Sequence, residues 1–161
     1  MEKTKKQTVD SDELLQMVSF KIGDEEFGVD ILKVQEINRM MSITKVPNAP
    51  AFVTGVVNLR GRIIPVIDLR YKLGMPGKDY DNDTRIVVVE VNDTTTGFIV
   101  DAVSEVLRIP RSITEAPPEM VSGIDSDYIT AVGKLEGKLL ILLDLEKVLS
   151  SGEMKRLAEV G

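Results

Sequence analysis

The sequence contains no histidine and no cysteine among its 161 residues. Their absence excludes a zinc site built from the usual ligands, a disulfide, a thiolate nucleophile and an imidazole base. Tryptophan is also absent, and with only four phenylalanines and three tyrosines the core must be aliphatic. Many enzyme mechanisms are therefore excluded before any motif is considered.

The chain also lacks a strongly basic segment and a long apolar run. Its net charge of −6 opposes sequence-independent binding of nucleic acid, which depends on Lys and Arg neutralising phosphates. Its longest aliphatic run, residues 139–143, is far shorter than a bilayer span, and residues 1–6 lead into no apolar signal core. We therefore expect a soluble cytoplasmic protein that neither binds nucleic acid nor inserts into a membrane.

What the chain does contain is an internal repeat. Residues 52–69 match residues 128–145 at their apolar, glycine and aspartate positions, and residues 27–37 match residues 98–106 in the same way. A period of roughly 70 residues is too long for a solenoid and suits a small domain duplicated in tandem. Positions at which the two copies differ are then the best guide to function.

Within each copy, apolar residues alternate between turns rich in Gly, Asp and Asn, a pattern that predicts short β-strands. The predicted strands are residues 15–22, 27–30, 35–39, 56–59 and 62–67, followed by 86–91, 98–102, 105–109, 132–135 and 138–143. Short helices are expected at residues 51–54 and 69–73. We predict an all-β fold of two tandem five-stranded β-barrels with a few short helices, because closure removes exposed strand edges.

The expected organisation has four parts. They are a disordered or loosely ordered arm (1–13), a first barrel (14–78), a second barrel (79–149) and a C-terminal tail or short helix (150–161). The groove between two such barrels suits a ligand or a partner helix. The pattern leaves open whether strands cross between the halves.

Carboxylates are the remaining candidates for acid-base chemistry. Asp68 and Asp144 occupy matching strand ends, and Asp30 and Asp101 form a second matching pair. Duplication of these residues in both copies favours helix caps and architecture over catalysis. Neither a nucleophile elbow nor a phosphate-binding loop is present. We expect a protein that is not an enzyme and needs no cofactor.

Arg60 lies where the two copies disagree, because the matching turn of the second copy carries Glu136. A tight turn needs its glycine but has no need for arginine, so Arg60 is either a partner contact or a solvated charge. Alternation predicts that Glu36 is exposed beside a buried Ile37. Val34 fits the core more readily than a contact surface.

Three segments, residues 23–37, 46–61 and 65–69, resemble the CheW family of chemotaxis coupling proteins. The similarity covers residues 14–149, and Asn-Leu-Arg-Gly at 58–61 is highly specific in this context. The resemblance implies a non-catalytic adaptor that links the histidine kinase CheA to the signalling tips of methyl-accepting chemoreceptors. It also implies a chain that is monomeric when isolated and is recruited to membrane-associated receptor arrays.

The resemblance further implies two sets of binding residues. A receptor-binding groove between the barrels would contain Val34, Glu36, Gly55, Asn58, Arg60 and Val103. Kinase contacts would include Glu119 and Met120, in a segment whose prolines favour an exposed loop. No cofactor is implied.

Two other functional classes are possible for such a fold. The regulatory domain of CheA shares it, but a whole kinase needs a phosphorylatable histidine and a nucleotide-binding module, and this sequence has neither. A barrel that binds or converts a small molecule in the groove would reveal itself by turnover or by ligand protection.

Overall fold

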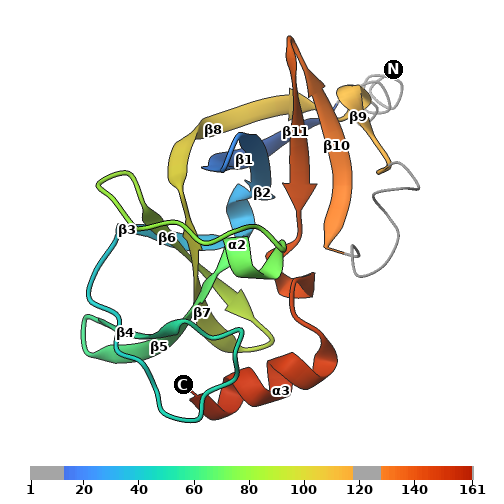
Figure 1. Cartoon of the computed structure of the whole chain (residues 1–161). Coiled ribbons are helices and arrows are strands. Elements are labelled where there is room, and N and C mark those ends of the chain that lie inside the picture. The colour runs from blue at the N-terminus through green and yellow to red at the C-terminus, as the bar shows by residue number, and fades with distance from the viewer. Residues whose placement is uncertain (1–12, 118–127, 161) are drawn as a thin grey trace.

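A computed structural model describes residues 13–117 and 128–160 (Figure 1). One sheet contains β1 (Leu14–Ile22), β2 (Glu25–Asp30), β8 (Ala102–Pro110), β9 (Thr114–Glu115), β10 (Ile129–Leu135) and β11 (Lys138–Leu143). The other contains β3 (Val34–Arg39), β4 (Gly55–Leu59), β5 (Arg62–Asp68), β6 (Arg85–Val91) and β7 (Thr94–Val100). The predicted all-β class is confirmed.

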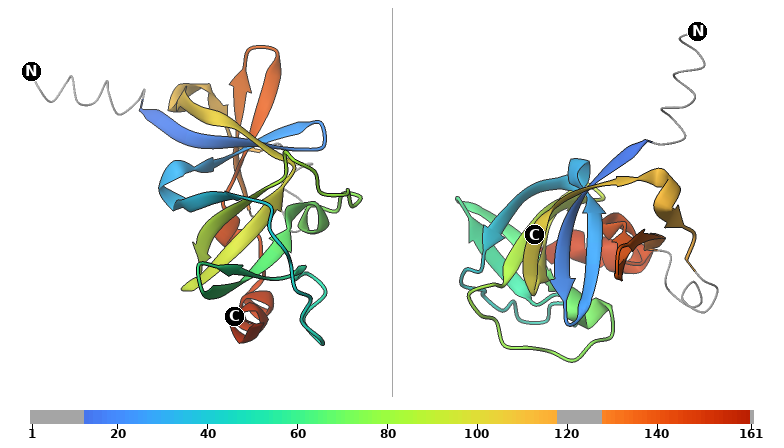
Figure 2. Two further views of the ribbon diagram at one scale, coloured as in Figure 1. Left: turned by 90° about the vertical axis from the view of Figure 1, so that its left-hand side faces the viewer. Right: turned by 90° about the horizontal axis from the view of Figure 1, so that it is seen from above.

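Short helices complete the described part of the chain. They are α2 (Leu69–Lys72), α3 (Ser151–Val160) and the 3-10 turns η1 (Ile31–Lys33), η2 (Arg111–Ile113) and η3 (Leu145–Lys147). The sheets lie one above the other, and α3 lies beside the five-stranded sheet, at the far end from β10 and β11 (Figures 1 and 2). In the described residues, no helix is long and apolar enough to cross a membrane.

The two sheets exchange hairpins between the two sequence copies. Their strand orders are β8-β1-β2-β11-β10-β9 and β3-β6-β7-β5-β4. The β1–β2 hairpin of the first copy therefore pairs with β8 and β11 of the second, and the β6–β7 hairpin of the second pairs with β3 and β5 of the first. Neither sheet is made from residues 14–78 or 79–149 alone, so the predicted division of the chain does not separate the sheets.

The two sheets have six and five strands, where the sequence predicted five in each. The extra strand, β9, contains only two residues. Among the described residues, backbone pairing leaves β8 and β9 at the edges of one sheet and β3 and β4 at the edges of the other. Backbone pairing alone therefore closes neither barrel.

A shared core joins the sheets. Val87 and Val89 of β6 face a cluster that also contains Phe20 and Phe27 of the other sheet, while Ile86 on the opposite face of β6 packs inside the five-stranded sheet. Phe20 and Phe27 stack with ring centroids 5.9 Å apart. Because β6 is buried on both faces, the two sheets stabilise each other.

Three of the four paired aspartates cap helical turns, as the sequence predicted. Asp68 Oδ1 accepts the backbone N–H of Arg70, and Asp30 and Asp144 accept equivalent bonds at the starts of η1 and η3. Asp101 caps no helix and instead accepts hydrogen bonds from the Arg70 guanidinium. All four residues thus have architectural roles, but Asp101 serves a different one.

The helix predicted at residues 51–54 is a turn. Val53 N donates to Pro50 O at 3.0 Å, which makes a single turn, but Thr54 N donates to Val66 O of β5 at 2.9 Å. The chain enters β4 at this point because its next donor pairs with a strand. A helix would need that donor to point back along the chain.

Candidate partner-binding surface

The β3 strand presents Glu36 in an orientation opposite to the predicted one. Ile37 is 39% exposed, whereas Glu36 is half-buried on the same face as Asn38. The β3–β6 register shifts between Val34 and Glu36, so Gln35 is an extra residue of the kind found in a β-bulge. Ile37 therefore lies on the same face as Val34, but β3 is an edge strand and leaves Ile37 partly uncovered, so the prediction for Glu36 and Ile37 was wrong.

Arg60 lies at the tip of the tight β4–β5 hairpin. Its φ is +52° and that of Gly61 is +88°, so both central residues of the turn have the left-handed backbone of a type I′ turn. Asn58 Oδ1 accepts the backbone N–H of Gly61 at 2.7 Å and so holds the turn. Asn58 therefore has a structural task next to Arg60.

An ion pair connects Arg60 with Glu36, since Arg60 Nη2 lies 2.6 Å from Glu36 Oε2. The two side chains are 68% and 29% exposed. Because β3 and β4 are the edge strands of the five-stranded sheet, the pair spans the gap between its two edges. The structure thus brings together the two charged residues that the sequence singled out.

Hydrogen bonds fix the charge state of this pair. The bond from Arg60, followed by one from Asn38 Nδ2 at 3.2 Å, lowers the pKa of Glu36 below its usual value. The Glu36 carboxylate in turn raises the pKa of Arg60. Both groups are ionised at neutral pH, and the exposed guanidinium retains N–H donors for a partner.

Two further polar contacts hold the strands beside this pair. Gln35 Nε2 donates to Glu90 Oε1 at 2.6 Å and links β3 to β6, while Arg62 Nη2 donates to Thr95 Oγ1 at 2.8 Å and links β5 to β7. Sequence reasoning missed these contacts because the partners are 55 and 33 residues apart. Their effect is to fix the positions of the strand ends that carry Glu36 and Arg60.

Gly55 is buried and has a packing role. A Cβ added to it would lie 2.5 Å from both Thr44 O and Ile43 Cγ2, so a larger residue would displace the neighbouring segment. Thr44 pairs with Val56 of β4 across this close approach. Among the described residues, Gly55 therefore acts by allowing the segment before β4 to pack against it.

Val34 and Val103 occupy matching positions at the starts of β3 and β8. Both are half-buried and pack against the core cluster that joins the sheets. The structure thus brings both valines to the joint, although Val103 belongs to the six-stranded sheet and Glu36 and Arg60 to the other.

Exposed apolar residues near β3 were not singled out from the sequence. Leu32, in η1, is 87% exposed and lies two residues before Val34. Leu32 belongs to the segment Ile31-Leu32-Lys33, most of which has no counterpart in the second copy. This difference between the copies could have pointed to Leu32 as a surface residue. Together with Ile37, Leu32 adds apolar area next to β3.

The two predicted kinase contacts have no structural outcome. The candidate kinase contacts Glu119 and Met120 lie outside the described residues. Within residues 13–117 and 128–160, no group of three or more metal-ligating side chains is placed to hold an ion.

A family model described as the CheW-like domain matches residues 16–153. The chain belongs to the CheW-like family. It is 44% identical over 135 residues to the chemotaxis protein CheW of Klebsiella aerogenes, covering 84% of this chain and 81% of that protein. It is 39% identical over 141 residues to CheW of Helicobacter pylori, covering 87% and 84% of the two chains.

A solved structure supports the same assignment. The crystal structure of the scaffolding protein TtCheW from Thermoanaerobacter tengcongensis matches with a TM-score of 0.78 and 37% identity, covering 87% of this chain and 95% of that one. The predicted resemblance to CheW is confirmed. Membership places the chain in a family of chemotaxis coupling and scaffold proteins.

Proposed function

We propose that this CheW-like chain is a non-catalytic adaptor that couples the kinase CheA to the cytoplasmic signalling tips of chemoreceptors. It would work in the cytoplasm, recruited to membrane-associated receptor arrays, and would be monomeric when isolated. The Glu36–Arg60 ion pair is the observation that carries this proposal. It holds an exposed guanidinium in a fixed place between the two edge strands of the five-stranded sheet.

The proposed receptor surface consists of Val34, Glu36, Gly55, Asn58, Arg60 and Val103. Of these, Arg60 and Glu36 would make polar contacts, Val34 and Val103 would provide apolar area at the joint, and Gly55 and Asn58 would support the local backbone. A helical receptor tip suits such a surface, because helices dock on apolar grooves while charged rims set their register. Glu119 and Met120 remain proposed kinase contacts.

Arg60→Glu tests the receptor surface. The variant places two carboxylates where a complementary pair stood, so we expect calorimetric titration to show at least about tenfold weaker binding of a receptor-tip fragment. Binding of the CheA regulatory domain is expected to stay within about twofold, because its proposed contacts lie elsewhere. Glu136→Arg, the reverse change at the matching turn, is the control and should affect neither titration.

A charge-swapped variant, Glu36→Arg with Arg60→Glu, separates a partner contact from a purely internal role. The swap restores an ion pair but reverses the charge offered to the receptor. We expect receptor binding to remain weak in the swapped protein. Recovery to the wild-type affinity would mean that the pair only supports the fold, and would remove Arg60 from the receptor surface.

A further inference from the structure

A small cavity of about 180 Å³ lies at the joint between the sheets, and residues of η1 and η3 form part of its lining. We call it the joint pocket. Its walls include Met17 of β1, Val29 of β2, Val89 of β6 and Leu143 of β11, so both sheets contribute. An apolar cavity of roughly 150 Å³ holds a benzene molecule, so this one has room for a single large side chain.

Charged residues surround this apolar interior. Asp30, Asp144, Glu146 and Lys33 also line the joint pocket. Lys33 Nζ lies 2.9 Å from Glu146 Oε2, and the charges of Asp144 and Asp30 add to that bond in raising the pKa of Lys33. One cation against three carboxylates leaves the rim with a formal charge of −2. The rim is therefore complementary to a further cation.

Backbone pairing places two of these carboxylates together. Leu143 lies opposite Val29 in the parallel β11–β2 pair, so the next residues, Asp144 and Asp30, leave the sheet side by side. Each uses its Oδ1 atom as a helix cap. The caps hold the two side chains in place at the mouth of the joint pocket.

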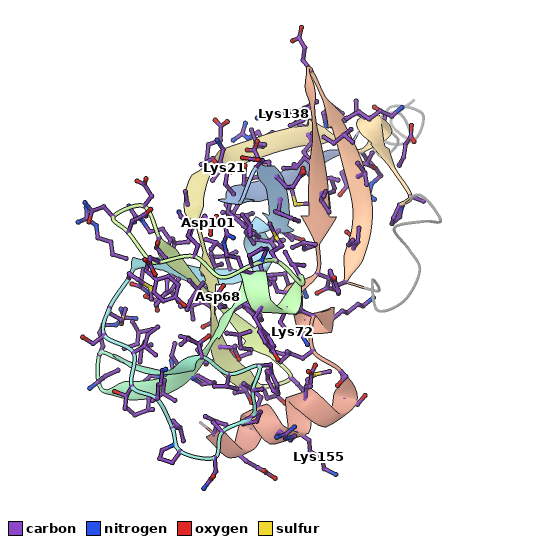
Figure 3. The ribbon with its side chains drawn as sticks, in the orientation of Figure 1. Lys21, Asp68, Lys72, Asp101, Lys138 and Lys155 are labelled. Carbon is purple, nitrogen blue, oxygen red and sulfur yellow. The ribbon has the colours of Figure 1, made fainter. Side chains whose placement is uncertain are left out.

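The other crossing between the sheets, at Asp101, shows what such a place accommodates. There the aspartate is Asp101, the counterpart of Asp30, and the residue matching Glu146 is Arg70 (Figure 3 labels Asp101). Arg70 Nε and Nη2 donate to Asp101 at 2.9 and 2.6 Å, and its Nη1 donates to Pro76 O at 2.7 Å. Arg70 and Glu146 match in the sequence but not in exact position, because the registers of the parallel pairs β5–β7 and β11–β2 differ by two residues.

At the Asp30 crossing, the position that matches Arg70 is taken by an acidic residue, Glu146. The aspartate that would receive a guanidinium is present, and an apolar cavity lies beside it. Glu146 pairs with Lys33, whose side chain is 57% exposed, and among the described residues Asp30 and Asp144 have no guanidinium of the kind that Asp101 has. The Asp30 crossing thus offers a binding place for an arginine where the Asp101 crossing already contains one.

We propose that the joint pocket binds an arginine side chain of a partner protein. The aliphatic stem would fill the apolar interior, and the guanidinium would bond Asp30 and Asp144 at the mouth. Arginine fits better than lysine, since its planar fork can bond two carboxylates while its stem is buried. This site is separate from the Glu36–Arg60 pair and does not depend on the receptor proposal.

The test is an NMR titration of the whole chain with blocked arginine, N-acetyl-arginine N-methylamide. We expect saturable amide shifts confined to residues 29–33 and 143–146. The citrulline analogue has nearly the same shape and no charge, and it should bind at least about tenfold more weakly. Equal binding of the two probes, or shifts spread over all acidic surfaces, would overturn the proposal. Because neither receptor nor kinase is present, failure here is distinct from failure of the proposed function.

Two variants give opposite expectations. Asp30→Asn keeps a capping oxygen but removes a charge, so the arginine probe should bind at least about fivefold more weakly. Lys33→Gln removes the competing internal cation, so the same probe should bind more tightly. Asp24→Asn, an equal charge change in the exposed β1–β2 turn, should leave binding unchanged.

The opposite response of the Lys33→Gln variant, weaker binding, would contradict the proposal. Pocket amides that shift with protein concentration alone, in the absence of any probe, would identify a second copy of this chain as the occupant and would also overturn it.

Discussion

At the scale of single residues, the sequence was most informative where the charge of a side chain differed between the two copies. It was least informative where the burial of a residue depended on a segment far away in the chain. The charge difference at Arg60 was visible in the repeat, and the structure pairs it with Glu36. The burial of Ile37 was predicted wrongly, because β3 lies at the edge of its sheet, and strand order depends on long-range pairing that alternation does not show. The resemblance placed Gly55 in the receptor-binding groove, and the structure buries it against the segment before β4.

Gly55→Ala tests this packing role. Because the added Cβ would lie 2.5 Å from a backbone oxygen, we expect the free energy of unfolding to fall by about 1–3 kcal/mol. Urea denaturation at pH 7 measures the change. Gly133→Ala is the matched control, since no atom lies closer than 3.7 Å to its Cβ position. An equal loss in both variants would show that the contact at Gly55 is unimportant.

At the scale of elements, strand existence followed from alternation, and three cap positions followed from aspartates at strand ends. The exchange of hairpins could not be predicted in this way. Two copies with the same strand pattern offer the β1–β2 hairpin two equivalent sets of neighbours, and alternation does not choose between them. The choice depends on the segments where the chain passes from one sheet to the other, at Asp30 and Asp101.

Asp101→Asn tests the second of these crossings. Asp101 and Arg70 are only 17% and 13% exposed, and Asp101 also accepts the Gly23 N–H at 2.7 Å. Leaving Arg70 without its carboxylate should destabilise the protein by about 2 kcal/mol at pH 7. Asp79→Asn, an exposed aspartate in the connection between α2 and β6, serves as the control and should change stability little.

The pH dependence of this variant has a definite sign. The Arg70 bonds lower the pKa of Asp101 below its ordinary 3.8. The carboxylate therefore stabilises the fold above that ordinary value, and its contribution is lost as the pH falls through the lowered pKa. The difference in unfolding free energy between wild type and Asp101→Asn should shrink on acidification. A difference that stays constant down to about pH 2 would contradict the ion-pair account.

At the scale of the whole molecule, the shared core makes the two sheets one folding unit. The joint cluster contains β1 and β2 residues of one sheet and β6 and β7 residues of the other. We expect the backbone amides of Val88, in the five-stranded sheet, and Leu142, in the six-stranded sheet, to be among the most protected. Their free energies of opening should lie within about 1 kcal/mol of each other. Native-state hydrogen exchange measures both values. A gap of several kcal/mol would show that the sheets unfold separately.

An adaptor must hold both of its partners at once, and this requirement is the most direct test of the proposed function. Sedimentation velocity of the chain mixed with a CheA regulatory domain and a receptor-tip fragment would make the measurement. We predict one species that contains all three proteins, and loss of only the receptor fragment from that species in the Arg60→Glu variant. Displacement of one partner by the other, or binding of neither, would contradict the adaptor account.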